Sequence, residues 1–148
     1  MTRPFYETSK DRAEELIAAK KIAAYFLFDI VQLKPACHAD FGIIKSGKVI
    51  GVMEVKRRKY TYDQMERMGG LMISAVKMQS LMNWKSSFGL GIMVGLQLSD
   101  GIYAFMVSRK DDLPMKSEIR IMGRTDRGDD QDMEPCVLLP MSEFTKCY

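Results

Sequence analysis

Three charged residues interrupt a stretch of sequence that otherwise suits the inside of a β-sheet. In FGIIKSGKVIGVMEVKRR, residues 41–58, two apolar runs surround a Ser-Gly turn, and the second run contains Glu54 and Lys56. Asp40 directly precedes the first run. Burying an unpaired charge is costly, so charged residues in a core strand need partners, a metal ion or a catalytic task.

The register of this hairpin decides whether Asp40 joins the other two charges. Alternate residues of a strand share a face, so Glu54 and Lys56 point the same way. With a two-residue turn at residues 46–47, Asp40 would lie on the face away from Glu54. With a three-residue loop at residues 46–48, Asp40 falls opposite Glu54. We predict this second register, or a bulge near Asp40, because either brings the two carboxylates together.

Two neighbouring carboxylates repel each other when ionised, so they favour a bound cation. Mg²⁺ takes oxygen ligands, keeps several waters and can bridge to phosphate, and the backbone carbonyl of Val55 is a natural further ligand. The ion lowers the pKa of a bound water, and the ammonium of Lys56 can orient that water or stabilise charge on phosphorus. The pattern predicts phosphodiester hydrolysis. The alternative is a surface ion pair between Glu54 and Lys56, which would stabilise little.

Further basic residues lie in and beside the same hairpin, although the formal net charge of the chain is only +3. A basic cluster next to a metal site is where a nucleic-acid backbone would bind. A solvated strand end is the alternative, above all for Arg57 and Lys59. The predicted nucleic-acid-binding residues are Lys45, Lys48, Arg57, Arg58 and Lys59.

The composition indicates one soluble domain spanning residues 1–148. Apolar residues make up 47% and charged residues 28%, and no apolar run approaches the roughly twenty residues of a membrane helix. The start of the chain carries no secretion signal, so we expect a cytoplasmic protein without a membrane partner. Three cysteines and one histidine form neither a familiar zinc spacing nor a disulfide set.

The hydrophobic pattern predicts an α/β fold. A helix is expected over residues 11–25, capped by Thr8 or Ser9, followed by a buried strand over about 26–33 and the hairpin at 41–58. Apolar steps of three and four predict a second helix over about 62–83, which bends or packs closely at Gly69-Gly70. Later strands are expected at 89–98, 102–109 and 117–124, then a charged loop at 125–135 and a short edge strand at 136–144.

This order predicts a three-layer αβα core with a central mixed sheet. The elements run helix, strand, strand, strand, helix, strand, strand over a core of about residues 11–108, with C-terminal strands and a charged loop at about 115–148. Both hairpin strands are apolar on both faces, and helices from two separate places can cover the two faces of the sheet.

In this order of elements and in the motif Asp40…Glu54-Val55-Lys56, the chain resembles the PD-(D/E)XK nuclease superfamily, which has the restriction-endonuclease-like fold. The resemblance implies that Asp40 and Glu54 bind metal and that Lys56 assists the attacking water. Members often add a glutamate from the first helix, which implies Glu15 here or its neighbour Glu14. Many also place a glutamine in the helix after the lysine, which corresponds to Gln64. Ala39 stands where the family usually has proline.

The resemblance and the residues together predict a Mg²⁺-dependent nuclease that acts on DNA, with Mn²⁺ as a substitute ion. RNA as the substrate, a homodimer, and the choice between endonuclease and exonuclease stay open. The alternative is a nuclease-fold module that binds nucleic acid or a protein partner without cutting. An intact set of two acids and a lysine favours the enzyme, because a binding module has no reason to bury those charges.

Overall fold

The computed structural model of the chain describes residues 9–107, 118–122 and 133–148. The first half consists of α1 (Ser9–Phe26), β1 (Asp29–Gln32), the short 3₁₀ helix η1 (Pro35–Cys37), β2 (Phe41–Lys45), β3 (Lys48–Arg57), α2 (Tyr62–Arg67) and β4 (Leu71–Ser74). The second half consists of α3 (Ala75–Phe88), β5 (Gly91–Leu98), β6 (Gly101–Val107), β7 (Glu118–Met122), β8 (Glu134–Leu139), the 3₁₀ helix η3 (Met141–Glu143) and β9 (Thr145–Lys146).

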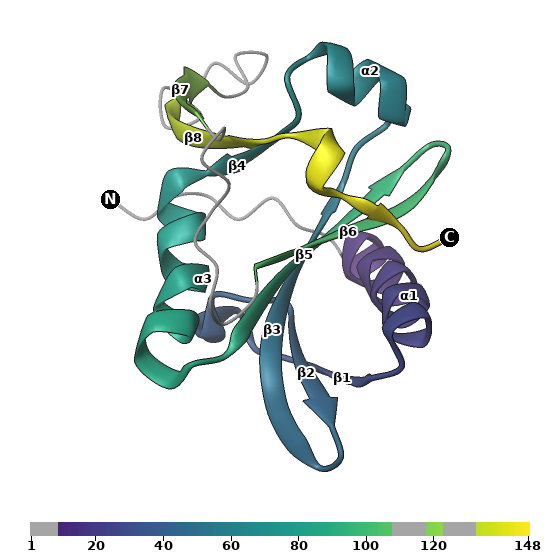
Figure 1. Ribbon diagram of the computed structural model, residues 1–148, viewed down its shortest axis with the longest axis vertical. Coiled ribbons are helices and arrows are strands. Elements are labelled where there is room, and N and C mark those ends of the chain that lie inside the picture. The colour runs from purple at the N-terminus through teal and green to yellow at the C-terminus, as the bar shows by residue number, and fades with distance from the viewer. Residues whose placement is uncertain (1–8, 108–117, 123–132) are drawn as a thin grey trace.

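Two sheets organise these elements. A six-stranded sheet has the order β1-β2-β3-β5-β6-β9, and a three-stranded sheet has the order β4-β8-β7. β3 and β5 run parallel and their neighbours run antiparallel, so the large sheet is mixed. α1 covers one face of it, while α3 and the small sheet lie over the other (Figure 1). The predicted α/β class with a central mixed sheet is confirmed, as are the β2–β3 and β5–β6 hairpins.

α1 approaches its face of the large sheet closely because the residues in contact are small. Ala18, Ala19, Ile22 and Ala23 are the buried residues of this helix. A Cβ atom added to Gly95 of β5 would lie 2.7 Å from Ile22 Cδ1. The helix predicted at residues 11–25 is therefore confirmed, with ends at Ser9 and Phe26. None of the described helices is long and apolar enough to cross a lipid bilayer.

The strand predicted as buried at residues 26–33 is shorter and more exposed than expected. Phe26 still belongs to α1, and Leu27 ends the helix with a φ of 59°. β1 spans only four residues and pairs with β2 alone, so it forms the edge of the large sheet. The apolar run at residues 26–33 had indicated a strand buried on both faces. Its two aromatic residues, Phe26 and Phe28, lie before β1 and stack on each other with ring centroids 6.0 Å apart.

The single helix predicted at residues 62–83 is wrong. α2 ends at Arg67, and Gly69 and Gly70 follow with φ angles of 100° and 123°, which L-residues with side chains rarely adopt. The close packing that these glycines indicated is present, because a Cβ on Gly70 would lie 2.1 Å from the carbonyl oxygen of Leu139. The chain then forms β4 before α3 begins after its N-cap, Ser74.

The strand predicted at residues 136–144 is not an edge strand. β8 is the middle strand of the small sheet, where β4 and β7 pair with its two sides. β7 confirms the strand predicted at 117–124, and most of the charged loop predicted at 125–135 lies outside the described residues. The error follows from the single helix predicted at residues 62–83, because that helix left no strand β4 to pair with β8.

We expect Gly70→Ala to lower the free energy of unfolding by at least about 2 kcal/mol, because the added methyl group meets the backbone of β8. Gly47→Ala is the matched control, since Gly47 also has a positive φ but no atom lies within 4 Å of its added Cβ. Its cost should be limited to the backbone strain of about 1 kcal/mol. Urea denaturation of both variants measures the difference, and equal losses would contradict the close packing.

Candidate active site

The β2–β3 hairpin has a two-residue turn and a bulge. Lys45 pairs with Lys48 across residues 46–47, which both have positive φ angles as the hairpin-favouring turn requires. The register shifts between Ile43 and Ile44, so Ile50 is an extra residue in β3. The predicted three-residue loop is therefore wrong. A bulge does absorb the extra residue, but it lies toward the turn rather than near Asp40.

This bulge brings the two acids together. Beyond it, Phe41 pairs with Met53, which places Asp40 next to Glu54 at the end of the hairpin. The backbone N–H of Asp40 donates to the carbonyl of Met53 at 3.0 Å. Its carboxylate oxygen Oδ2 accepts the backbone N–H of Val55 at 2.8 Å. Asp40 is thus held against β3 by its main chain and by its side chain.

Glu54 is the one charged side chain buried among the residues that the structure describes, with 4% of its surface exposed. Two ammonium groups accompany it. Lys56 Nζ lies 3.1 Å from Oε1, and Lys77 Nζ lies 3.6 Å from Oε2. The second distance is too long for a hydrogen bond, so Oε2 is a buried acceptor without a hydrogen-bond partner in the described part of the chain.

The electrostatics of the pair favour a cation. Burial, and then the neighbouring charge of Glu54, raise the pKa of the Asp40 carboxyl from 3.8 to about 6. The hydrogen bond from Val55 and the positive charges of Lys56 and Lys77 act in the opposite direction without cancelling the rise. A carboxyl group with such a pKa is incompletely compensated by its protein surroundings, and a divalent cation would compensate it further.

The donor atoms at this position fit a hard divalent ion. The N–H and C=O of a strand residue project to the same side, so the carbonyl of Val55 lies on the side of β3 that its N–H shares with Asp40. Two carboxylates and one carbonyl are oxygen ligands of the kind that Mg²⁺ prefers. The described residues contain no group of three or more His, Cys, Asp or Glu side chains that could hold a metal. Water or substrate would have to complete the coordination.

Arg57 points away from this site. Successive strand residues face opposite sides of the sheet, so Arg57 follows Val55 toward α1. There its guanidinium forms an ion pair with Asp11 at 3.2 Å and another with Glu14. Glu14, the alternative to Glu15, is therefore engaged with this arginine. Glu15 itself is half-buried on the same helix.

Gln64 has a local structural contact. Its side-chain Oε1 accepts the N–H of Thr61 at 2.9 Å, and the Thr61 hydroxyl accepts the N–H of Gln64 at 3.2 Å. This reciprocal pair is a capping box that begins α2. Gln64 thus stands in the helix after the lysine, where many family members have a glutamine, but its side chain caps the N-terminus of α2.

The other basic residues form two separate groups. Lys45 and Lys48 are exposed at the hairpin turn, roughly 15–20 Å from the acids at the usual rise per strand residue. Arg58 and Lys59 follow the opposite end of β3 and line a cavity of about 340 Å³ together with Gln97. Burial lowers the pKa of Arg58 from its ordinary value, and its guanidinium donates to the carbonyl of Arg57 at 2.8 Å.

Sequence reasoning missed Lys77. It lies in the first turn of α3, and its ammonium reaches both Glu54 and the carbonyl of His38, the latter at 3.4 Å. The sequence did contain one sign that Lys77 has a special role, because it is the only charged residue between Arg67 and Lys85. The expectation of one long helix hid it, since the start of α3 was not recognised.

The raised pKa of Asp40 predicts an unusual pH dependence of stability in chelator-treated protein. The folded state binds the proton more tightly than the unfolded state, so this stabilisation is complete below about pH 4 and is lost as pH rises through about 6. The loss should amount to about 2 kcal/mol and should disappear in Asp40→Asn. Urea denaturation from pH 4 to pH 7 measures it, with Asp29→Asn as control. A parallel pH dependence in wild type and Asp40→Asn would refute the shift.

Comparisons with known proteins identify the family and the fold of the chain. The family described as "Phage putative PDDEXK endonuclease" matches residues 1–147. No curated protein matches the chain. Among solved structures, the fold is similar to that of Hjc, a Holliday junction resolvase from Archaeoglobus fulgidus, with a TM-score of 0.51 and 13% sequence identity over 90% of this chain and 91% of that one. The restriction-endonuclease-like fold is thereby confirmed. The chain belongs to the phage PD-(D/E)XK endonuclease family.

Proposed function

We propose that the protein is a Mg²⁺-dependent endonuclease that hydrolyses phosphodiester bonds in DNA, with Mn²⁺ as a substitute ion. Membership of an endonuclease family supports nuclease activity. The observation that carries the metal dependence is the buried Glu54 Oε2, which has no hydrogen-bond partner among the described residues, beside a second carboxylate with a raised pKa. Such a pair is costly to bury unless a cation compensates it.

Asp40, Glu54 and the Val55 carbonyl would hold the ion. A divalent ion bound there would supply Lewis acidity and lower the pKa of a coordinated water. The protein keeps the carboxylates in position, since Val55 N–H fixes Asp40 and Lys56 fixes Glu54 Oε1. These contacts preorganise the site before substrate arrives.

Lys56 has the place and the exposure to act on the substrate. Its ammonium is anchored 3.1 Å from Glu54 while 27% of its side chain remains exposed. It can therefore donate a hydrogen bond to the attacking water and offset negative charge on the phosphoryl oxygens. We assign it the role of orienting the water.

The DNA backbone would follow the basic end of β3. Arg58 and Lys59 line the cavity there, and the exposed Lys45 and Lys48 offer a second contact at the hairpin turn. Arg57 would contribute less, because Asp11 and Glu14 already pair with it. The name of the structural neighbour gives a DNA junction as the substrate of that protein, and we carry over only DNA.

Four expectations from the sequence remain predictions. Glu15 is proposed as an additional acid near the site, and Gln64 as an additional polar group that would first have to leave its capping contact. A homodimer is proposed as the assembly. A single nuclease domain acting in the cytoplasm is proposed for residues 1–148.

Cleavage of plasmid and single-stranded DNA with Mg²⁺ or Mn²⁺ tests the proposal. Glu54→Gln removes a metal ligand and Lys56→Ala removes the water-orienting ammonium, so each should lower the cleavage rate by at least about 100-fold. The matched controls are Glu66→Gln and Lys20→Ala, which change exposed residues of α2 and α1 and should cleave like wild type.

The same proteins separate the enzyme from a binding module. Isothermal titration calorimetry should detect Mn²⁺ uptake by wild type and Lys56→Ala, and none by Glu54→Gln. If all variants cleave equally, the cleavage comes from a contaminant and the assignment of residues is wrong. If wild type binds DNA but neither binds Mn²⁺ nor cleaves, the chain is a non-catalytic module.

Lys77 should compete with the metal ion for Glu54. Its ammonium lies 3.6 Å from Oε2 and would repel a metal ion bound there, so Lys77→Met removes this repulsion and frees that oxygen. We expect Mn²⁺ to bind about 5-fold more tightly to this variant in calorimetry, where about 1 kcal/mol corresponds to such a factor. Lys20→Met is the control for the substitution itself. Weaker binding to Lys77→Met would instead indicate that the ammonium holds Glu54 in its binding position.

A further inference from the structure

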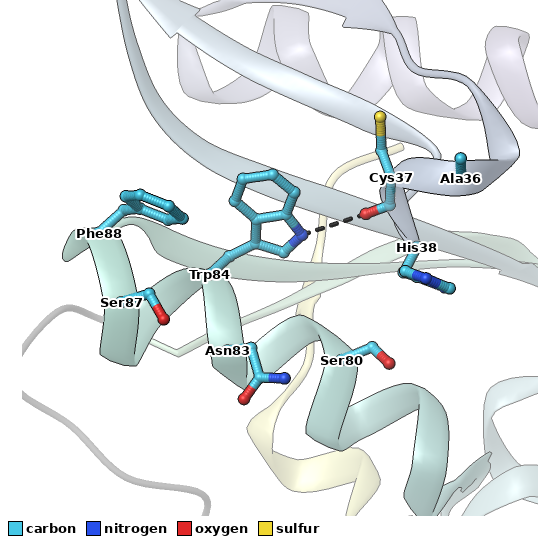
Figure 2. Close-up of a pocket in the computed structure, with 8 residues that line it drawn as sticks. All are labelled: Ala36, Cys37, His38, Ser80, Asn83, Trp84, Ser87 and Phe88. Atoms are coloured by element: carbon cyan, nitrogen blue, oxygen red, sulfur yellow. Dashed lines mark hydrogen bonds between the residues drawn. The ribbon is translucent and has the colours of Figure 1, made fainter.

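A groove lies between η1 and α3, and His38, which lines it, is two residues from Asp40 in the chain. It has a volume of about 360 Å³, within the range of about 300–1,000 Å³ that is usual for small-ligand sites. Figure 2 shows Trp84 near its centre, Phe88 one turn further along α3, and Cys37 and His38 on the η1 side. None of the lining residues is acidic.

Trp84 is fixed in this groove. Its indole N–H donates to the carbonyl of Cys37 at 3.2 Å, which ties α3 to η1 (Figure 2). Phe88 lies against it, with ring centroids 5.7 Å apart and an interplanar angle of 37°. Trp84 also packs on the core, whereas Phe88 is 69% exposed. Core packing therefore accounts for Trp84 but leaves Phe88 unexplained.

Lys77 links the groove to the acid pair. Lys77, Trp84 and Phe88 stand at positions i, i+7 and i+11, which share one face of α3. At the helical rise per residue, Lys77 and Trp84 are about 10 Å apart along the axis. The Lys77 ammonium contacts both Glu54 of the acid pair and His38, which lines the groove. A nucleic-acid strand could reach from one to the other within a few nucleotides.

The chemistry of the groove suits a nucleobase. Aromatic rings stack on bases regardless of sequence, and the Asn83 amide and Ser80 hydroxyl offer hydrogen-bonding groups for a base edge. A base within a duplex is already stacked and its faces are inaccessible, so the occupant must be unpaired. We propose that this groove binds an unpaired base of the substrate strand next to the bond that is cut. The proposal rests on the proposed nuclease function and specifies its substrate as DNA with unpaired nucleotides near the cut.

Trp84 reports on the groove directly, because it is the only tryptophan of the chain. A short oligothymidylate is titrated into wild-type protein with chelator present, so that no cleavage occurs. We expect the fluorescence of Trp84 to be quenched, and a blunt duplex of equal length to quench it much less. Phe88→Ala should weaken binding of the oligothymidylate about 10-fold, as expected for one lost stacking contact. Tyr25→Ala, which removes an exposed aromatic ring from the end of α1, is the matched control and should bind like wild type.

Other outcomes overturn the proposal. Saturating oligothymidylate that leaves Trp84 fluorescence unchanged, or Phe88→Ala that binds like wild type, would exclude a base in the groove. Equal quenching by duplex would exclude the requirement for an unpaired base. If Phe88→Ala dissociates a dimer without changing affinity for the oligothymidylate, the groove serves a second copy of the chain. Circular dichroism of Phe88→Ala verifies that it is folded.

A second variant and a parallel assay separate this proposal from the nuclease assignment. Trp84→Phe keeps an aromatic ring, so its affinity for labelled oligothymidylate, measured by anisotropy, should stay within about 3-fold of wild type; a larger loss would overturn stacking as the basis of binding. Cleavage by wild type with Mg²⁺ tests the nuclease function alone. If wild type cleaves DNA and Phe88→Ala binds oligothymidylate like wild type, only the groove proposal is refuted. If oligothymidylate quenches Trp84 but wild type does not cleave, the groove proposal is supported and the nuclease assignment is refuted.

Discussion

The burial of the Glu54 carboxylate is the constraint around which the site is built. A carboxylate with 4% of its surface exposed needs positive charge nearby, and the structure supplies Lys56 from the same strand and Lys77 from α3. These two ammonium groups leave Oε2 without a hydrogen bond and the pKa of Asp40 raised. Protein groups alone thus compensate the negative charge of the two carboxylates incompletely. This incomplete compensation, which results from burial in the sheet, is the reason for proposing that a cation binds there.

The alternation of β3 sorts its charges between two tasks. Glu54 and Lys56 face α3, where the acid pair forms, whereas Arg57 faces α1 and is held by Asp11 and Glu14. Three charged residues within four positions of β3 therefore contribute both to the site and to the attachment of the first helix. The charges of these residues do not show which of them belongs to the site. Their alternation along the strand does, because successive residues face opposite sides of the sheet.

The sequence predicted the parts of the site that lie close together in the chain. Asp40, Glu54 and Lys56 stand out because charges rarely occur within apolar strands, and the hairpin that holds them is local. The position of the bulge and the contact with Lys77 could not be predicted, because both depend on packing between distant segments. A bend or close packing was predicted at Gly69-Gly70, but the strand β4 that follows was not, because β4 forms by pairing with the distant β8. Local periodicity predicted the first helix and the two hairpins, but it missed β4 and the small sheet that β4 forms with β8 and β7.

Because Ile50 is an extra residue in β3, the number of residues between the turn and Glu54 determines which face of the sheet the glutamate occupies. Between the turn and Glu54, adding or removing a single residue would rotate the glutamate to the α1 face, away from Lys77. Adding or removing a pair would preserve its orientation. In relatives of this chain, the side chains near the turn should accordingly vary. The number of residues between the turn and the glutamate should differ only by even numbers.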